Sequence, residues 1–226
     1  MRLREQVVVV TGANGAVGSV LIDYLKSRAE HVVGCLRGAS VDWRPAEDHL
    51  SYVTCNLADK VAVNFMVAEI LRHLESCHAW INVAGGFSLD GWIEEVSPEA
   101  WKRMFDLNFI TCLNACQAIW LVFKDQDFGR IINFGSIAGD MGMAQASPYA
   151  VSKAAVHNLT HTLAQEGGNQ VTSNLIIPSI IDTQANREAM PDADFSTWTD
   201  PEAIAEKIAA ILDQADQPPN GEKYYF

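Results

Sequence analysis

The sequence predicts an α/β protein with three layers, in which helices cover both faces of a doubly wound parallel sheet. Short runs that are apolar throughout, such as "VVVV" at 7–10, alternate along the chain with longer segments of helical periodicity. Strands that are apolar throughout are buried on both faces, which is typical of parallel sheets flanked by helices. The regular alternation of strand and helix then favours the doubly wound arrangement.

The expected elements follow one another without an interrupting linker. Strands are expected at 6–12, 31–36, 50–57, 79–85, 129–136, 171–178 and, at the sheet edge, 222–226. Helices are expected at 16–29, 59–76, 98–123, 147–167 and 200–214. The fourth helix starts at a serine-proline pair and ends at a glycine, which are usual boundary residues of helices. We therefore expect a single domain over 1–226, with a polar loop at about 184–199 that is a candidate substrate loop.

Composition narrows the class of protein. The 226 residues are 49% hydrophobic, enough for a sizeable core, and the formal net charge of −12 argues against nucleic acid or an anionic membrane as a partner. No apolar run reaches the roughly eighteen residues of a membrane span, and the N-terminus has no signal-peptide pattern. The cysteines are odd in number and form no C-x-x-C, so we expect reduced thiols in a cytoplasmic protein.

A glycine-rich turn, "TGANGAVGS" at 11–19, separates the first strand from the first helix. Glycines three residues apart allow a tight turn and a close approach of the backbone to a pyrophosphate, and the helix N-terminus attracts phosphate. The pattern predicts dinucleotide binding, whereas a purely structural turn is the alternative. The residues expected to contact the cofactor here are Gly12, Asn14, Gly15, Ala16, Val17 and Gly18.

The end of the second strand indicates which dinucleotide binds. A carboxylate there would accept hydrogen bonds from the adenosine ribose, whereas a basic residue would meet the additional phosphate of NADP. The strand ends in "GCLRG", with Arg37 at its tip. NADP(H) is therefore expected over NAD(H), unless Arg37 simply points to solvent.

A tyrosine and a lysine lie four residues apart in "YAVSK", so Tyr149 and Lys153 share one face of a helix. A nearby cation lowers the pKa of a phenol by roughly 1–3 units, which suits a proton donor or acceptor. Ser136 ends the fifth strand, at the sheet edge where ligands of such proteins bind. These three residues predict a site that handles a carbonyl oxygen, although a tyrosine–lysine pair alone is often a solvated surface.

Six pieces of the chain, in this order and spacing, resemble the short-chain dehydrogenases/reductases over nearly its whole length. The pieces are "TGANGAVG", "NVAGG" (82–86), "LN" (107–108), "FGS" ending at Ser136, "YAVSK" and "PSIIDT" (178–183). The resemblance implies a Rossmann-type sheet and an enzyme that transfers hydride between a nicotinamide cofactor and a small carbonyl or hydroxyl substrate. It also implies a homodimer or homotetramer.

The same resemblance implies roles for individual residues. Tyr149 would give or take the proton, Lys153 would lower its pKa and bind the nicotinamide ribose, and Ser136 would orient the substrate oxygen. Asn108 would bend its helix and help to hold a proton-relay water. The further cofactor contacts that it implies are Asn56, Asn82, Ala84, Gly85, Tyr149, Pro178 and Thr183. Ala16 stands where many members have glycine, and Asn56 where an aspartate often contacts adenine.

A narrower resemblance concerns the segment after "PSIIDT". Its pattern "DT..NR..MP.ADFS.WT", together with "VAGGF", is similar to dihydropteridine reductase, a branch that reduces quinonoid dihydropterin. The side chains expected to contact substrate are Phe87, Met141, Phe195 and Trp198. Phe195 and Trp198 would either close over a flat substrate or staple the loop to the body. Ser136 and Arg37 depart from that branch, so ketone reduction is favoured, with pterin reduction as the alternative.

Two other interpretations carry less support. A nucleotide-sensing protein without turnover is a further alternative, but all four catalytic residue types are present. His157 and His161 have the spacing of metal ligands on one helix, yet no third ligand stands nearby in the sequence. No metal site is therefore expected, and the resemblance favours a subunit interface for that helix.

Overall fold

In the computed structural model, which describes residues 1–226, eight strands form one sheet in the order β3-β4-β2-β1-β5-β6-β7-β8. The strands are β1 (Val7–Thr11), β2 (His31–Arg37), β3 (Asp42–Glu47), β4 (Leu50–Cys55), β5 (Ala79–Asn82), β6 (Gly129–Phe134), β7 (Val171–Ile177) and β8 (Lys223–Tyr225). All neighbouring strands are parallel except the antiparallel pair β3 and β4. The predicted doubly wound sheet is confirmed, and its order reverses between β1 and β5.

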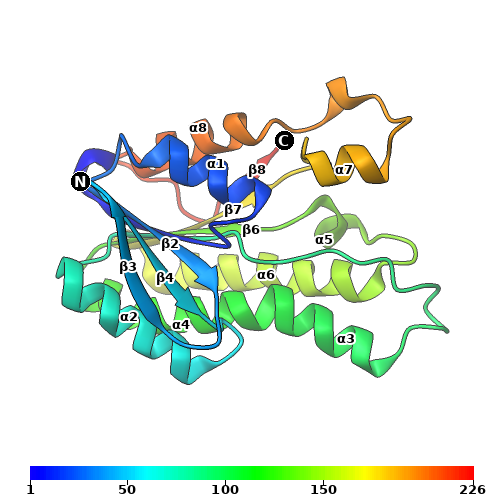
Figure 1. Ribbon diagram of the computed structural model, residues 1–226, viewed down its shortest axis with the longest axis horizontal. Coiled ribbons are helices and arrows are strands. Elements are labelled where there is room, and N and C mark those ends of the chain that lie inside the picture. Colours follow the sequence, from blue (N-terminus) through cyan, green and yellow to red (C-terminus); the bar gives the residue numbers. More distant parts are fainter.

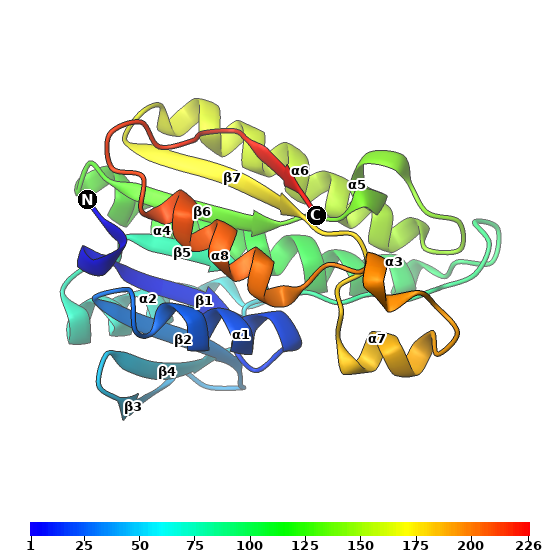
Figure 2. The ribbon, with the colours of Figure 1, turned by 90° about the horizontal axis from the view of Figure 1, so that it is seen from above.

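Helices cover both faces of the sheet (Figures 1 and 2). They are α1 (Ala16–Leu25), α2 (Lys60–Leu74), α3 (Pro98–Phe105), α4 (Thr111–Asp125), α5 (Ile137–Met141), α6 (Ser147–Gly167), α7 (Gln184–Ala189) and α8 (Pro201–Leu212). Helices α1 and α8 lie on one face, and α2, α4 and α6 lie on the other (Figure 1). A π-helical turn, Asp106–Ile110, joins α3 to α4, and short 3₁₀ turns occur at Leu3–Glu5 and Phe195–Thr197.

Two hydrophobic clusters sandwich the sheet. Successive residues of β1 point to opposite faces, so Val8 belongs to the cluster beneath α1 and α8, whereas Val9 belongs to the cluster beneath α2, α4 and α6. Both residues are fully buried, which explains why the strand is apolar throughout. All five cysteines are buried and unpaired, as expected from their number and spacing.

The edge strand β3 and the short helices α5 and α7 were not predicted. The sequence of β3, "DWRPAE", is polar and contains Pro45, and nearly all its residues are exposed. An edge strand pairs on one side only, so it needs neither an apolar pattern nor every backbone donor. Its register with β4 shifts between Pro45 and Glu47. The apolar pattern that predicts buried strands is therefore absent from β3.

The continuous helical segment Pro98–Asp125 is long and apolar enough, by composition, to cross a membrane. Its C-terminal part packs on the sheet, where Cys116, Ile119 and Phe123 are buried among residues of the core. The apolar side chains that face the sheet in this part are thus those of a core helix.

Candidate active site

The glycine-rich turn lies between β1 and α1. Gly12 has a φ of +66°, which favours glycine, and its carbonyl accepts a hydrogen bond from Gly15 N at 2.9 Å. A Cβ on Gly18 would lie only 2.1 Å from the Gly12 carbonyl oxygen, so helix and turn pack too closely for any side chain. Gly15 caps the N-terminus of α1. The geometry required for a pyrophosphate site is therefore built from backbone.

Thr11 fastens the loop after β5 to this turn. Its hydroxyl oxygen accepts hydrogen bonds from the backbone N–H groups of Val83 and Ala84, both at 3.1 Å. A Cβ on Gly12 would lie 3.0 Å from the Ala84 Cα, so the two segments touch backbone to backbone. The sequence reasoning did not single out Thr11, because its partners are more than seventy residues away.

A cleft of about 630 Å³ opens beside this turn, past the carboxyl ends of β2 and β4. The predicted cofactor residues that line it are Gly12, Asn14, Arg37, Asn56 and Ala84. The opposite wall belongs mainly to α3 and the turn after it. A closely packed glycine turn, the N-terminus of α1 and a cleft of this size together fit a dinucleotide.

Three cations border the cleft, and they differ in their partners. Lys102 is paired with Asp106, and Arg103 with Asp90. Arg37, at the end of β2, is exposed and makes no ion pair. It is therefore the cation that is free to meet an anionic group of a ligand.

The hydroxyls of Ser136 and Tyr149 come together beyond the end of β6. Ser136 caps the N-terminus of α5, and its Oγ accepts a hydrogen bond from Ala138 N at 3.2 Å. Tyr149 lies in the first turn of α6, where burial raises the pKa of its phenol and the neighbouring Ser136 side chain partly counteracts that effect. The ring of Phe87 meets the Tyr149 ring edge to face, with centroids 4.9 Å apart. The structure thus places a predicted substrate residue against the predicted proton donor.

Lys153 follows one turn later on α6 and is 7% exposed. Its ammonium donates a hydrogen bond to the Phe134 carbonyl at 2.9 Å, and burial lowers the pKa of Lys153 to about 8. The expected lowering of the Tyr149 pKa by Lys153 is not seen. Instead burial raises that pKa, because the ammonium is anchored on the end of β6 and Tyr149 is shielded from water.

Asn108 lies inside the π-helical turn, where the helix departs from regular geometry. Its Oδ1 accepts a hydrogen bond from Gly86 N at 2.9 Å, and its Nδ2 donates to the Gly86 carbonyl at 3.0 Å and to Ser152 Oγ at 3.1 Å. A Cβ on Gly85 would lie 2.7 Å from Asn108 Oδ1 and 3.5 Å from Lys153 Nζ. The loop after β5 thus runs from the cleft to the predicted catalytic residues Asn108 and Lys153.

Three predicted cofactor residues use their side chains within the protein or are buried. Asn82 accepts a hydrogen bond from Trp80 Nε1 at 3.0 Å and donates to Asn133 at 2.8 Å, inside the core. Thr183 caps α7 by accepting a hydrogen bond from Asn186 N at 3.2 Å. Pro178 is buried directly after β7. Their predicted cofactor contacts stay predictions.

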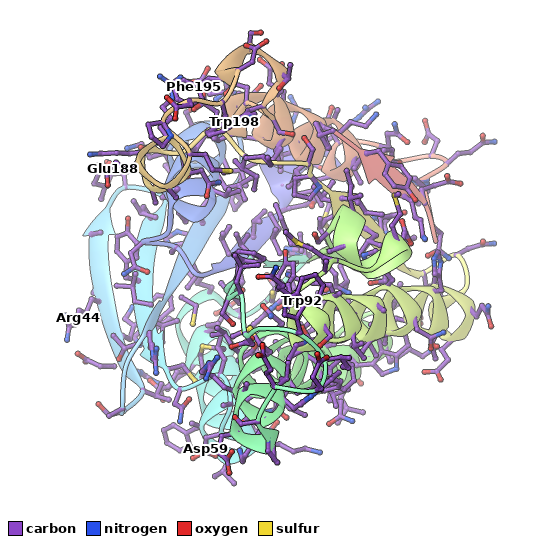
Figure 3. The ribbon with its side chains drawn as sticks, turned by 90° about the vertical axis from the view of Figure 1, so that its right-hand side faces the viewer. Arg44, Asp59, Trp92, Glu188, Phe195 and Trp198 are labelled. Atoms are coloured by element: carbon purple, nitrogen blue, oxygen red, sulfur yellow. The ribbon has the colours of Figure 1, made fainter.

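The predicted substrate loop projects from the end of the molecule where α5 and the loop after β5 also lie (Figures 1 and 2). Phe195 and Trp198 pack on each other with ring centroids 4.7 Å apart, and the Arg187 guanidinium lies 4.8 Å from the Phe195 centroid. Figure 3 shows the two rings together beside α7, with Trp92 nearer the middle of the view. This mutual packing suits a stapled loop, and their contact with a substrate stays a prediction.

Exposed apolar side chains rim the same end of the molecule. Besides Phe87 and Met141, they include Leu89, Trp92 and Ile93, which the sequence reasoning passed over. The backbone N–H of Asp90 donates to the Gln145 carbonyl at 2.8 Å, so the loop after β5 lies against the loop that precedes α6. The signal was present as "FSLDGWI", a run of large apolar residues in an expected loop.

Comparisons with known proteins agree with this geometry. The family described as short chain dehydrogenase matches residues 6–194. An acetoacetyl-CoA reductase of Paracoccus denitrificans is 27% identical over 97% of this chain and 99% of its own length. The 3-oxoacyl-(acyl-carrier-protein) reductase FabG of Vibrio cholerae is 25% identical over 93% of this chain and 91% of its own. A solved structure of an ElxO variant with NADPH bound has a TM-score of 0.87 at 19% identity, covering 98% of this chain and 96% of its own.

Proposed function

The chain belongs to the short-chain dehydrogenase family and is a nicotinamide-dependent oxidoreductase, and from that premise we propose that it reduces a small ketone with NADPH. The observation that carries the proposal is the proximity of the Ser136 and Tyr149 side chains past the end of β6, with the ammonium of Lys153 anchored nearby on the Phe134 carbonyl. The cofactor supplies the hydride when it is bound in the cleft.

The chain's own residues handle the proton and the oxygen. Ser136 donates a hydrogen bond to the carbonyl oxygen and so fixes its position. Tyr149 donates its proton to that oxygen, and the raised pKa of its phenol keeps it protonated at neutral pH, as proton donation requires. Lys153 lies one helical turn away and stays largely charged at neutral pH, since its pKa is about 8, and we assign to it the nicotinamide ribose.

Arg37 supports NADP(H) as the cofactor. It is exposed at the cleft without a carboxylate partner, and an arginine forms paired hydrogen bonds with a phosphate. The NADPH-bound ElxO variant, which has the same fold, supports the same choice. We expect kcat/KM to be higher with NADPH than with NADH, and Arg37→Asp to reverse that order. Wild-type preference for NADH would contradict this assignment.

The relatives that reduce acetoacetyl-CoA and 3-oxoacyl groups make 3-oxo thioesters the first ketones to assay. Quinonoid dihydropterin is the alternative substrate, and the Phe87 ring against Tyr149 favours it, because an aromatic wall suits a flat heterocycle. Rates of NADPH oxidation with acetoacetyl-CoA, cyclic ketones and quinonoid dihydropterin distinguish ketone reduction from pterin reduction. Ser136→Ala should lower the rate only with a carbonyl substrate, since only a carbonyl substrate needs that hydroxyl.

We also propose that the protein forms a homodimer or homotetramer. Large apolar side chains on the outer faces of α2 and α4 support a surface covered in the assembly: Phe65 is 62% exposed and Leu121 is 74% exposed. Analytical ultracentrifugation tests this proposal, and a monomer at micromolar concentration would refute it.

A further inference from the structure

The ring of His157 lies beneath the turn that carries Ser136. His157 stands on α6 one turn beyond Lys153, is 5% exposed, and accepts a hydrogen bond from the Ser136 backbone N–H through Nε2 at 3.2 Å. A Cβ on Gly135 would lie 2.3 Å from Nε2, and one on Gly139 would lie 2.8 Å from Cε1. The turn from β6 to α5 therefore wraps closely around the imidazole, and it has glycines where the ring needs room.

A second hydrogen bond fixes the state of the ring. His157 Nδ1 lies 3.1 Å from Asp140 Oδ1. Because Nε2 must accept from Ser136, the ring proton belongs on Nδ1, from which it donates to the carboxylate. Burial lowers the pKa of His157, although the Asp140 carboxylate acts in the opposite direction, so the ring is neutral at physiological pH. A protonated Nε2 could not accept the Ser136 bond.

Asp140 is in turn held by the last strand of the sheet. Lys223 Nζ lies 2.8 Å from Oδ1, and the Tyr225 hydroxyl donates to Oδ2 at 2.8 Å. Burial opposes the charge on Asp140, but the bonds from Lys223, Tyr225 and His157 outweigh it and lower the pKa to about 2. A chain of polar contacts thus runs from β8 through Asp140 and His157 to the backbone of Ser136.

The Ser136 backbone determines where its hydroxyl points. Its φ of −166° and ψ of 151° place it in extended geometry directly before α5. The bond to His157 holds that backbone, while Gly135 N is held separately by the Ile176 carbonyl at 2.8 Å. Loss of the His157 bond would let the serine turn away from Tyr149.

We propose that His157 and Asp140, tied to β8 by Lys223 and Tyr225, are positioning residues that hold the Ser136 hydroxyl against the substrate oxygen. This inference rests on the proposed carbonyl reduction. It assigns to His157 a role in the reaction. The four-residue spacing of His157 and His161, which is typical of metal ligands on a helix, did not predict that role.

The test is a double-mutant cycle between His157 and Ser136, assayed by acetoacetyl-CoA reduction. We expect His157→Leu, which removes the acceptor, to lower kcat by about tenfold in the wild-type background and by less than about twofold in Ser136→Ala, because its effect passes through that hydroxyl. His157→Gln, which keeps an acceptor and a donor, should recover part of the loss. His161→Leu, on the same helix and without a side-chain hydrogen bond, is the matched control and should leave kcat unchanged.

Equal losses in both backgrounds would overturn the inference and leave the proposed function standing. An unchanged kcat in Ser136→Ala alone would overturn both, since the serine would then have no part in the reaction. Tyr225→Phe serves if His157→Leu fails to fold, because it removes one hydroxyl from an exposed residue. It should lower kcat by about two- to threefold, and only when Ser136 is present.

A measurement without substrate tests the same geometry. The ¹⁵N shifts of the histidine rings report which nitrogen carries the proton. We expect His157 to be neutral at pH 7 with its proton on Nδ1. A proton found on Nε2 would exclude the bond from Ser136 and so overturn the inference.

Discussion

The proposed cofactor region is built from backbone, whereas the proposed substrate region is built from side chains on loops. On the first side, Gly12, Gly18 and Ala84 touch so closely that added atoms would collide with main chain. On the second side, Trp92 and Met141 project with exposed fractions of 54% and 82%. The glycines of the proposed cofactor region can therefore hardly be replaced by any larger residue. The exposed side chains of the proposed substrate region can vary without disturbing the fold.

The largest effect is expected at the boundary of the two sides, from Tyr149→Phe. Removal of the hydroxyl deletes the proposed proton donor, and kcat should fall by about 10²–10⁴-fold. The dissociation constant for NADPH, measured by fluorescence, should change little, because the phenyl ring still packs on Phe87. Turnover at the wild-type rate would refute the role of the phenol. A large loss of cofactor binding instead would mean that the two sides are not separable.

Gly18→Ala tests the backbone side. The new Cβ would lie 2.1 Å from the Gly12 carbonyl oxygen, so turn and helix must separate, at a cost of about 1–3 kcal/mol in the free energy of unfolding, together with weaker NADPH binding. Gly15→Ala is the matched control, since its Cβ would lie 3.2 Å from the same oxygen and its φ is negative. Both are measured by thermal unfolding and by fluorescence titration of NADPH. Equal effects would show that glycine spacing, and not this contact, governs the turn.

The pH dependence of stability tests the ring beneath Ser136. Because burial holds the pKa of His157 below 6.5, the unfolded chain binds more protons in the range between the two values. The stabilisation that the neutral His157 ring contributes to the free energy of unfolding is therefore fully present above about pH 6.5. It is lost as the pH falls through the pKa of His157 in the folded protein, with a slope of at most about 1.4 kcal/mol per pH unit. The charged groups that face the ring are Asp140, Lys223 and Lys153.

His31 and His78 are also buried enough for their pKa values to be lowered, so the difference between wild type and His157→Gln isolates this ring. The free energy of unfolding, measured with denaturant at pH 5 to 8, should depend less on pH in the variant than in the wild type. An equal pH dependence in the two proteins would mean that the protonation of His157 is not coupled to unfolding.

The smallest effect is expected on the loop side. Trp92→Ala removes an exposed ring from the apolar rim, so the free energy of unfolding should change by no more than about 0.5 kcal/mol. The KM for acetoacetyl-CoA should rise severalfold, while NADPH binding stays unchanged. An unchanged KM for every substrate tested would remove this rim from the substrate site.

The difference between the two sides also explains how far the sequence could be interpreted. Buried strands and the glycine turn follow from local rules, so the sheet was predicted and Gly12 and Arg37 were placed on one cleft. The proximity of Ser136 and Tyr149 was predicted from the spacing of "FGS" and "YAVSK" in the sequence. The anchoring of Lys153 on Phe134 depends on side-chain reach, and the contacts of Asp140 with Lys223 and Tyr225 join residues more than eighty positions apart. No local pattern encodes such contacts.

The π-helical turn at Asp106–Ile110 has a consequence for how this region can change in length. A π turn holds one residue more than an α turn. An insertion or deletion of one residue there would therefore rotate the side chains of α3 about the helix axis by about 100° relative to those of α4. Deletion of one residue would restore an unbroken α-helix, rotate Lys102 and Arg103 off the cleft wall and withdraw Asn108 from Gly86. This stretch should therefore accept replacements on its outer face while its residue count stays fixed.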